Sequence, residues 1–265
     1  TAPEVLEVSV NTDNPTSSSY GRHDDTVTLS FKTSEPIQTP TANSVTVTGL
    51  SGVTLTGNDA KTEWTATGTV AADASGSAAF SIKVSDRAGN PSAEVTATDD
   101  ETAVTLDTTA PTLSNLELVS TNAKDGTRHA KSGDDLTLTF TSSEAIPAPT
   151  VTLAGTSVTA TDTSSGAKTS WQATHPVADG DTGDVAFSIS YADPAGNAGG
   201  SQGEPSVQNT FTLDTTTPTL SLVGLSSSNS DTALAKADDT LTLSFTSSES
   251  LINPVVSIAG QTQTL

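Results

Sequence analysis

The residues of this chain with the clearest chemical potential are acidic and amide side chains that recur in fixed motifs. Glu144 closes a Ser-Ser-Glu motif, Asp193 and Asn197 delimit an Asp-Pro-Ala-Gly-Asn motif, and Asp107 lies in a Leu-Asp-Thr-Thr motif. Hard cations such as Ca²⁺ take about six to eight oxygen ligands from carboxylates, carbonyls and water. The chain has no Cys and only three scattered His residues, so its ligands favour calcium over zinc.

The spacing of these motifs reveals an internal repeat. Trp64 recurs as Trp171, 107 residues later, and the other landmarks keep nearly the same interval. Self-similarity at a fixed period is the sequence signature of tandem structural units. We therefore divide the chain into repeat 1 (residues 1–107), repeat 2 (residues 108–214) and a partial repeat 3 (residues 215–265).

A proline-containing hexapeptide lies at each boundary between repeats. Residues 106–111 read Leu-Asp-Thr-Thr-Ala-Pro, and residues 213–218 read Leu-Asp-Thr-Thr-Thr-Pro. Proline fixes φ and has no N–H, so it suits a place where one sheet ends and the next begins. We interpret the two hexapeptides as the first joint and the second joint between consecutive domains.

Short runs in which apolar residues alternate with Thr and Ser predict β-strands. Residues 26–31 read Thr-Val-Thr-Leu-Ser-Phe, and residues 135–140 read Asp-Leu-Thr-Leu-Thr-Phe, so every second side chain can face a core. No segment has the periodicity of a convincing helix. Such strands, with turns roughly every 8–12 residues, are typical of a Greek-key β-sandwich. The pattern predicts one sandwich for each complete repeat.

Strand direction predicts which acids meet at the first joint. When strands alternate in direction, the turns after the first and fifth strands lie at the far pole, and those after the second and sixth lie at the near pole, beside the incoming linker. Asp25 falls in a far-pole turn of repeat 1, whereas Glu144, Asp193 and Asn197 fall in near-pole turns of repeat 2. Asp107 lies in the linker between them. We expect these residues to surround a calcium site, and the bound ion to rigidify the joint.

The second joint offers a similar set of oxygen ligands. They are Asp134, Asp135, Asp181 and Asp184 from repeat 2, Asp214 from the linker and Glu249 from repeat 3, of which we favour Asp135, Asp214 and Glu249. A purely structural alternative exists for all these acids, because Asp and Gly also favour tight turns. That alternative is the stronger one for Asp73. It is weaker for Glu144, because Glu is a poor turn former and its motif recurs at the same period as the others.

Three stretches of the chain carry a resemblance to a known family. They are residues 107–113 (Asp-Thr-Thr-Ala-Pro-Thr-Leu), residues 133–144 (Gly-Asp-Asp-Leu-Thr-Leu-Thr-Phe-Thr-Ser-Ser-Glu) and residues 193–197 (Asp-Pro-Ala-Gly-Asn). On these motifs the whole chain resembles the tandem bacterial immunoglobulin-like repeats of large secreted adhesins and biofilm-associated surface proteins. The resemblance implies an all-β fold of tandem immunoglobulin-like Greek-key β-sandwiches arranged linearly, which act as stalk modules and bind calcium at their joints. Residues 22–25 (Arg-His-Asp-Asp) and Thr217 depart from the pattern without removing an acidic candidate.

The charge of the chain disfavours several kinds of partner. With 31 acidic and 10 basic residues, its formal net charge is −21, which suits neither nucleic acid nor an anionic membrane surface. The sequence also lacks an apolar run long enough to span a membrane. We expect no nucleic-acid partner, no membrane insertion, and a soluble piece of a longer extracellular protein at the cell surface.

The sequence does not indicate an enzyme. His23, His129 and His175 occupy different positions within their repeats, and none forms a recognisable Ser–His–acid arrangement. The two tryptophans, one in each complete repeat, lie on alternating strands. We expect them to fill the cores instead of stacking on a sugar.

These observations favour a structural role for the chain. We expect an extender, or stalk, segment of a bacterial surface adhesin, whose partners are the neighbouring repeats of the same chain. The rival interpretation is a subunit of an extracellular filament or sheath that self-associates laterally, in a filament or biofilm. A carbohydrate-binding module is less favoured, because aromatic residues make up only 4% of the chain. Repeat 3 should form a partial sandwich with an exposed apolar strand face.

Overall fold

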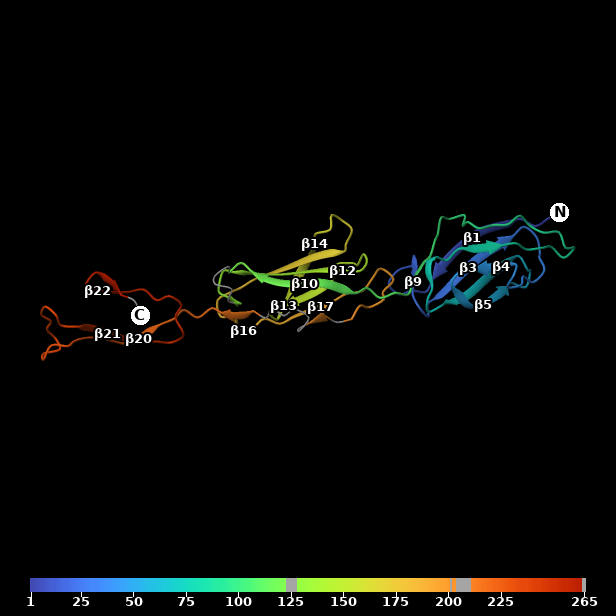
Figure 1. The fold of residues 1–265 in the computed structure, drawn as a ribbon. Coiled ribbons are helices and arrows are strands. Elements are labelled where there is room, and N and C mark those ends of the chain that lie inside the picture. Colours follow the sequence, from blue (N-terminus) through green and yellow to red (C-terminus); the bar gives the residue numbers. More distant parts are fainter. Residues whose placement is uncertain (123–127, 201, 204–210, 264–265) are drawn as a thin grey trace.

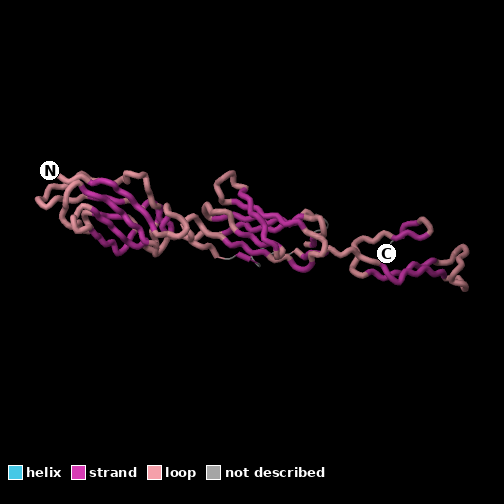
Figure 2. The backbone as a smooth tube through the Cα atoms, turned by 180° about the vertical axis from the view of Figure 1, so that it is seen from behind, coloured by secondary structure: helices cyan, strands magenta, loops and turns pink. Residues whose placement is uncertain are grey.

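The computed structural model describes residues 1–122, 128–200, 202–203 and 211–263, and strands are the regular elements found among them. The predicted all-β fold is therefore confirmed. Figures 1 and 2 show the strands gathered into successive groups along an elongated chain, with the N-terminus at one end and repeat 3 at the other. No segment of the described chain forms a helix with the length and apolar character that a membrane crossing requires.

Repeat 1 forms three small sheets from strands that alternate in direction. The main sheet has the order β1-β3-β6-β5, and the others have the orders β4-β8 and β2-β9-β7. Strands β2 and β9 pair in parallel, and the remaining pairs of this repeat are antiparallel. The bounds are β1 Val5–Thr12, β2 Tyr20–Gly21, β3 Thr26–Thr33, β4 Val45–Val47, β5 Leu50–Gly57, β6 Glu63–Val70, β7 Ser75–Ser77, β8 Phe80–Ile82 and β9 Thr105–Asp107.

Repeat 2 has the same plan with more extensive pairing. Its main sheet has the order β10-β12-β15-β14-β13-β17-β18, and a second sheet has the order β11-β19-β16. Strand β14 joins the two halves of the main sheet because its first part pairs with β13 and its last part pairs with β15. The bounds are β10 Leu113–Ser120, β11 His129–Ala130, β12 Asp135–Ser142, β13 Thr150–Leu153, β14 Thr156–Asp162, β15 Ser170–Pro176, β16 Thr182–Asp184, β17 Phe187–Ser190, β18 Gln202–Gly203 and β19 Thr212–Asp214.

Each complete repeat has its own apolar core, and strand alternation builds it. Every second side chain from Val27 to Phe31 in β3 is buried, as is every second side chain from Leu136 to Phe140 in β12. One cluster of buried apolar residues runs from Val8 to Leu106, and the other runs from Leu118 to Leu213. The two clusters share no residue. The described contacts between the repeats are therefore made by their poles, outside either core.

The two tryptophans are core residues, as predicted. Trp64 is 2% exposed and Trp171 is 4% exposed. Trp64 lies opposite Phe31 in the β3–β6 register, and Trp171 lies opposite Phe140 in the β12–β15 register. In both repeats the indole Nε1 donates a hydrogen bond of 3.3 Å to the backbone carbonyl three residues earlier. The polar atom of each ring is thus satisfied while its faces are covered.

Repeat 3 consists of two separate two-stranded sheets in the described residues. Strand β20 (Leu220–Ser227) pairs with β21 (Leu241–Ser247), and β22 (Val256–Ile258) pairs with β23 (Gln261–Gln263). Large apolar side chains on β20 are exposed, with Leu222 82% exposed. The expected exposed apolar strand face is therefore present.

We expect the substitution Trp171→Ala to lower the free energy of unfolding of repeat 2 by about 3–5 kcal/mol, because it removes a large side chain from a filled core. Repeat 1 should keep its stability, since the two cores share no residue. Denaturant unfolding, followed separately for each repeat, measures the effect. Trp64→Ala is the reciprocal control. A Trp171→Ala protein with unchanged unfolding of repeat 2 would contradict the core assignment.

Backbone amides of β21 should exchange with solvent faster than those of β12, the equivalent strand of repeat 2. Strand β12 lies between β10 and β15, whereas β21 pairs only with β20 among the described residues. A two-stranded sheet without a covered apolar face is marginally stable in water. Hydrogen exchange read by mass spectrometry compares the two strands within one sample. Equal protection of both strands would show that repeat 3 is a stably packed unit.

Candidate metal centre

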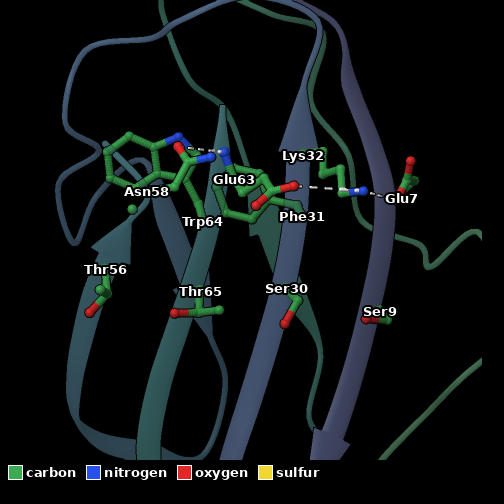
Figure 3. Close-up of a pocket in the computed structure, with 11 residues that line it drawn as sticks. Glu7, Ser9, Ser30, Phe31, Lys32, Thr56, Asn58, Glu63, Trp64 and Thr65 are labelled. Carbon is green, nitrogen blue, oxygen red and sulfur yellow. Dashed lines mark hydrogen bonds and ion pairs between the residues drawn. The ribbon is translucent and has the colours of Figure 1, made fainter. Parts of the chain in front are cut away.

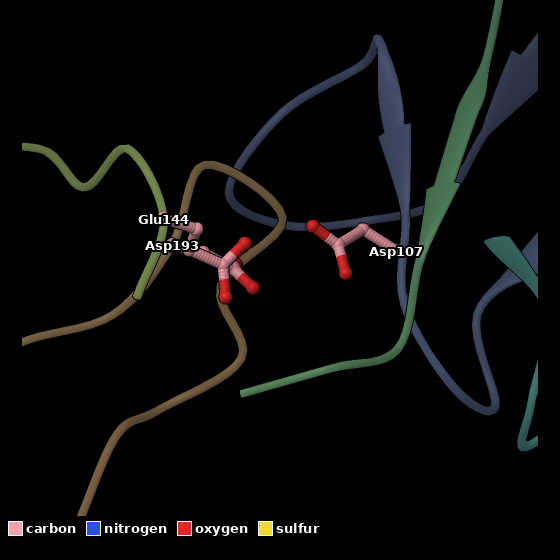
Figure 4. A group of neighbouring side chains, drawn as sticks. All are labelled: Asp107, Glu144 and Asp193. Atoms are coloured by element: carbon pink, nitrogen blue, oxygen red, sulfur yellow. The ribbon is translucent and has the colours of Figure 1, made fainter. Parts of the chain in front are cut away.

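Three predicted acids meet at the first joint. Asp107 is the last residue of β9, Glu144 follows β12, and Asp193 lies in the turn after β17. One carboxylate oxygen from each lies within 4.8 Å of the others. Figure 4 shows Asp107 approaching from repeat 1, while Glu144 and Asp193 approach from repeat 2. A linker acid and two near-pole turns thus converge on one point, as strand direction predicted.

Local hydrogen bonds fix the linker side of this acid group. Asp107 ends a strand, where it is paired opposite Ser75 of β7. Its Oδ1 accepts a hydrogen bond of 3.1 Å from the backbone N–H of Thr109. This Asx-type turn, which Asp favours, begins the linker and sets the direction of the Asp107 side chain.

The turn that carries Glu144 is tied to the same linker. The backbone N–H of Ser143 donates to the carbonyl of Thr112 at 2.9 Å, and the N–H of Thr112 donates to the hydroxyl of Ser143 at 3.0 Å. The hydroxyl of Ser142 in turn donates to the carbonyl of Glu144. The Ser-Ser-Glu motif therefore has a local physical role: its two serines position the backbone beneath the glutamate.

Asp193 is buried and held by its own turn, residues 193–197, called here the repeat-2 turn. Asp193 Oδ1 accepts the backbone N–H of Asn197 at 2.9 Å, and its Oδ2 accepts the Asn197 Nδ2 at 2.7 Å. Asp86 and Asn90 make the same two bonds, at 2.8 and 2.7 Å, in the repeat-1 turn, residues 86–90. There the bonds from Asn90 hold the pKa of Asp86 below its usual value. The motif is a self-closing turn that also presents a carboxylate.

Asn197 connects the two repeats through hydrogen bonds from its side-chain nitrogen. Its Nδ2 donates to the backbone carbonyl of Asp107 at 2.8 Å as well as to Asp193. An amide nitrogen of this kind is a hydrogen-bond donor and cannot ligate a cation. Through this nitrogen Asn197 holds the linker against the repeat-2 turn, whereas the predicted ligation of a cation would use its Oδ1.

Burial and like charge make this acid group electrostatically costly. The pKa of Glu144 is raised, first because burial penalises its charged form and then because Asp107 and Asp193 repel it. None of the ion pairs formed by the described residues includes any of the three carboxylates. The group consequently has the oxygen chemistry and the unbalanced negative charge that suit a divalent cation.

Asp25, the other acid predicted for the first joint, is engaged inside repeat 1. It is buried, and its Oδ2 accepts Asn14 Nδ2 at 2.7 Å and the backbone N–H of Arg22 at 2.8 Å. Its Oδ1 also lies 3.7 Å from Arg22 Nε. Asp25 is near the joint but outside the group of three converging acids. Its partners, Asn14 and Arg22, contact repeat 2 directly and were not singled out from the sequence.

At the second joint the structure distinguishes two adjacent candidate acids, Asp134 and Asp135. The residue equivalent to Asp25 is Asp134, which is buried and accepts the backbone N–H of Lys131 at 2.8 Å. Asp135 is the exposed first residue of β12. Successive side chains of a strand point to opposite sides, so only one of two adjacent acids can face inward. Asp135 is not brought together with Asp214 or Glu249.

Asp214 and Glu249 reproduce two parts of the first joint. Asp214 Oδ1 accepts the N–H of Thr216 at 3.1 Å, as Asp107 accepts Thr109. The backbone carbonyl of Glu249 accepts the hydroxyl of Ser247, as in the motif of repeat 2. Both acids line one depression between the repeats. Glu249 Oε1 is buried without a hydrogen-bond partner among the described residues, which is the state of an oxygen suited to a ligand.

A second depression lies on the outer face of the main sheet of repeat 1 (Figure 3). Lys32 lines this depression, and its Nζ lies 2.6 Å from Glu7 Oε2 and 3.8 Å from Glu63 Oε1. The hydrogen bond and the charge of Glu7 raise the pKa of Lys32. Trp64 lines the depression but is covered, and the rest of its rim is mainly Ser and Thr. The depression therefore lacks the exposed aromatic face that a sugar-binding platform uses.

Comparisons with known protein families and with curated proteins give no match. Solved structures that align with the chain include tandem immunoglobulin domains of titin, at 12% identity and a TM-score of 0.24, covering 81% of this chain and 97% of that one. The Yersinia pseudotuberculosis adhesin InvE matches at 13% identity and a TM-score of 0.25, covering 77% and 60%. The D00–D0 domain of intimin matches at 14% identity and a TM-score of 0.26, covering 74% and 98%. The sheets and the separate cores of repeats 1 and 2 agree with the predicted tandem β-sandwiches.

The raised pKa of Glu144 gives repeat 2 a specific dependence on pH. The folded state binds the proton more tightly than the unfolded chain, so the charged carboxylate costs stability above the folded pKa. That cost disappears as the pH falls below the ordinary value of the unfolded chain. In chelator at pH 7, Glu144→Gln should therefore be more stable than the wild type, and the difference should vanish on acidification.

Thermal unfolding of the two proteins across this pH range measures the difference. Comparing them cancels the contributions of the other carboxylates, several of which have lowered pKa values. Glu35→Gln, the equivalent change in repeat 1, is the matched control, because Glu35 is outside the group of three acids. A wild type that is the more stable of the two at pH 7 in chelator would disprove the repulsion.

Proposed function

We propose that the chain is an extender segment of a bacterial surface adhesin, in which repeats joined end to end set a distance from the cell. The observation that carries the proposal is the separation of roles within each repeat. The core lies in the middle of a repeat, and the described contacts with the next repeat lie at a pole. Length can then grow with repeat number while each unit remains independently packed.

The outer surfaces of repeats 1 and 2 support an extender more than a filament subunit. Among their described residues, the exposed large apolar side chains are Leu6 and Val119, which are 43% and 42% exposed. Single apolar residues of this kind are ordinary on a protein surface and do not form an interface. Lateral self-association in a filament or sheath would need a contiguous apolar patch on these faces.

Calcium at the joints is the second part of the proposed function. Asp107, Glu144 and Asp193 would hold the ion at the first joint, and Asp214 and Glu249 would contribute at the second. The donor set fits, because it consists of oxygens, carries excess negative charge and includes the unpartnered buried Glu249 Oε1. When bound, the ion supplies positive charge that links carboxylates of two consecutive repeats. The chain's own residues supply the orientation of those carboxylates.

The electrostatic gain from an ion at this place is substantial. Two like charges about 4 Å apart repel by about 1 kcal/mol in water and by about 4 kcal/mol at an effective dielectric constant near 20. The three carboxylates therefore repel one another until a cation offsets their negative charge. An affinity of about 10⁻⁴–10⁻³ M, as in other extracellular calcium modules, would load the joints outside the cell. This range suits the proposed location at the cell surface.

Calcium should stabilise repeat 2 of the wild-type protein and leave Glu144→Ala nearly unaffected at the first joint. At ten times the dissociation constant, one site contributes about 1.4 kcal/mol of apparent stability. Isothermal titration calorimetry and thermal unfolding, with calcium and with chelator, measure binding and stabilisation. Glu35→Ala is the control and should respond to calcium as the wild type does.

Absence of any calcium-dependent heat or stabilisation would overturn the calcium part of the proposal. Sedimentation and small-angle scattering test the extender part separately. An extended monomer supports it, whereas laterally associated species at low concentration would favour the filament alternative.

A further inference from the structure

The tip of the repeat-2 turn is inserted against the far pole of repeat 1. Asn14 Nδ2 donates to the carbonyl of Ala195 at 2.8 Å, and Arg22 Nη1 donates to the carbonyl of Gly196 at 2.8 Å. Two successive backbone carbonyls of one repeat thus receive side-chain N–H groups from the other. Ala195 is completely buried in this arrangement. These two hydrogen bonds involve none of the three acidic side chains of the candidate metal centre.

Hydrogen bonds within repeat 1 orient these donors toward the turn. Asn14 Oδ1 accepts the backbone N–H groups of Thr16 and Ser17, at 2.7 and 3.1 Å, which directs its Nδ2 away from them. That Nδ2 also donates to Asp25, which binds the backbone and guanidinium of Arg22 as well. Asp25 therefore orients both donors. Asn14, Arg22 and Asp25 together are called here the turn-binding site.

The fit depends on glycine at the second position of the tip. Gly196 has φ +86°, and a Cβ there would lie 2.6 Å from Thr16 Oγ1 and 3.3 Å from Arg22 Nη1. Gly89, the equivalent residue of the repeat-1 turn, has φ +94° and nothing within 4 Å of such a Cβ. Both turns need a residue tolerant of positive φ. Only the repeat-2 turn also requires a residue without a Cβ, because atoms of repeat 1 lie where that Cβ would be.

We propose that the far pole of repeat 1 is a specific site for a peptide turn of the form Asp-x-Ala-Gly-Asn, and that it fixes the orientation of repeat 2 without a cation. This goes beyond the proposed function, in which calcium links carboxylates of consecutive repeats. The partner that fits this site is another repeat. It must present two successive backbone carbonyls in a turn, and the second of those two residues must be glycine. Interdomain contacts as small as a single joint allow swinging by default, so these directional bonds decide whether the joint holds.

Each end of the chain carries one half of the same pairing. Asn229 Nδ2 and the backbone N–H of Lys236 both bind Asp239 Oδ2 at 2.8 Å in repeat 3, matching Asn14, Arg22 and Asp25. The repeat-1 turn, residues 86–90, is closed by the same bonds as the repeat-2 turn. Repeat 1 therefore presents the turn at its near pole and the donors at its far pole, whereas in repeat 2 the equivalent Asn122 Nδ2 donates to the carbonyl of His129. The pairing is directional, head to tail.

The experiment measures the orientation of the first joint in the complete chain. Because the sequence has no Cys, spin labels on Thr56→Cys and Gln172→Cys report one distance between exposed strand positions of repeats 1 and 2. Distance distributions from pulsed electron spin resonance are recorded in chelator. The test variants are Gly196→Ala and Arg22→Ala.

In chelator, we expect a single narrow peak for the wild type, and loss of that peak for Gly196→Ala and for Arg22→Ala. Gly89→Ala is the matched control, since it adds the same backbone strain in open space and should keep the peak. Lys131→Ala, the equivalent of Arg22→Ala at the other joint, should keep it too. Hydrogen exchange of β3 and β12 verifies that both repeats remain folded in every variant.

Two results would overturn the turn-binding site: a broad wild-type distribution in chelator, or narrow peaks that survive in both test variants. Adding calcium separates this inference from the proposed function. If calcium binds as proposed, it narrows the distribution of the Arg22→Ala protein. If calcium changes nothing, the calcium proposal fails while the comparison made in chelator stands.

Discussion

Repulsion between like charges at the first joint is the constraint on which the arrangement of repeats depends. Asp107, Glu144 and Asp193 bring three carboxylates within 4.8 Å, yet they belong to segments that could move apart. Opposing that repulsion are hydrogen bonds made a few residues away by Asn197 and by the turn-binding site. The joint therefore combines an anionic gap, which a cation can fill, with a neutral contact that sets direction.

Much of this arrangement follows from the sequence because it rests on periodic patterns. Alternation of apolar residues predicted the buried positions of β3 and β12, and the period of 107 residues placed Trp171 in the same environment as Trp64. Strand direction alone brought Asp107, Glu144 and Asp193 to one point. These inferences need only the alternation of side chains along a strand, the alternation of strand direction and the repeat period, all of which can be read from the sequence.

What the sequence did not resolve depends on contacts between distant residues. Asp134 and Asp135 are chemically identical neighbours, and their difference in burial follows from strand parity, because Leu136 faces the core and Asp135 therefore faces outward. Arg22 and Asn14 contact carbonyls that lie 174 and 181 residues further along the chain. A signal did exist for the asparagine, since it recurs as Asn122 and Asn229. Backbone carbonyls carry no mark in the sequence, so their partners could not be read from it.

The parallel pairing of β2 with β9, and of β11 with β19, would have a mechanical consequence in the proposed stalk. A force along the row of repeats enters each one through its first strands and leaves through its last. In two parallel strands those points of loading lie at opposite ends of the pair. The hydrogen bonds between the two strands are then loaded in shear at the same time, instead of breaking one after another. In the proposed stalk, each complete repeat would therefore have a parallel pair between an early strand and its last strand that a pull loads in shear.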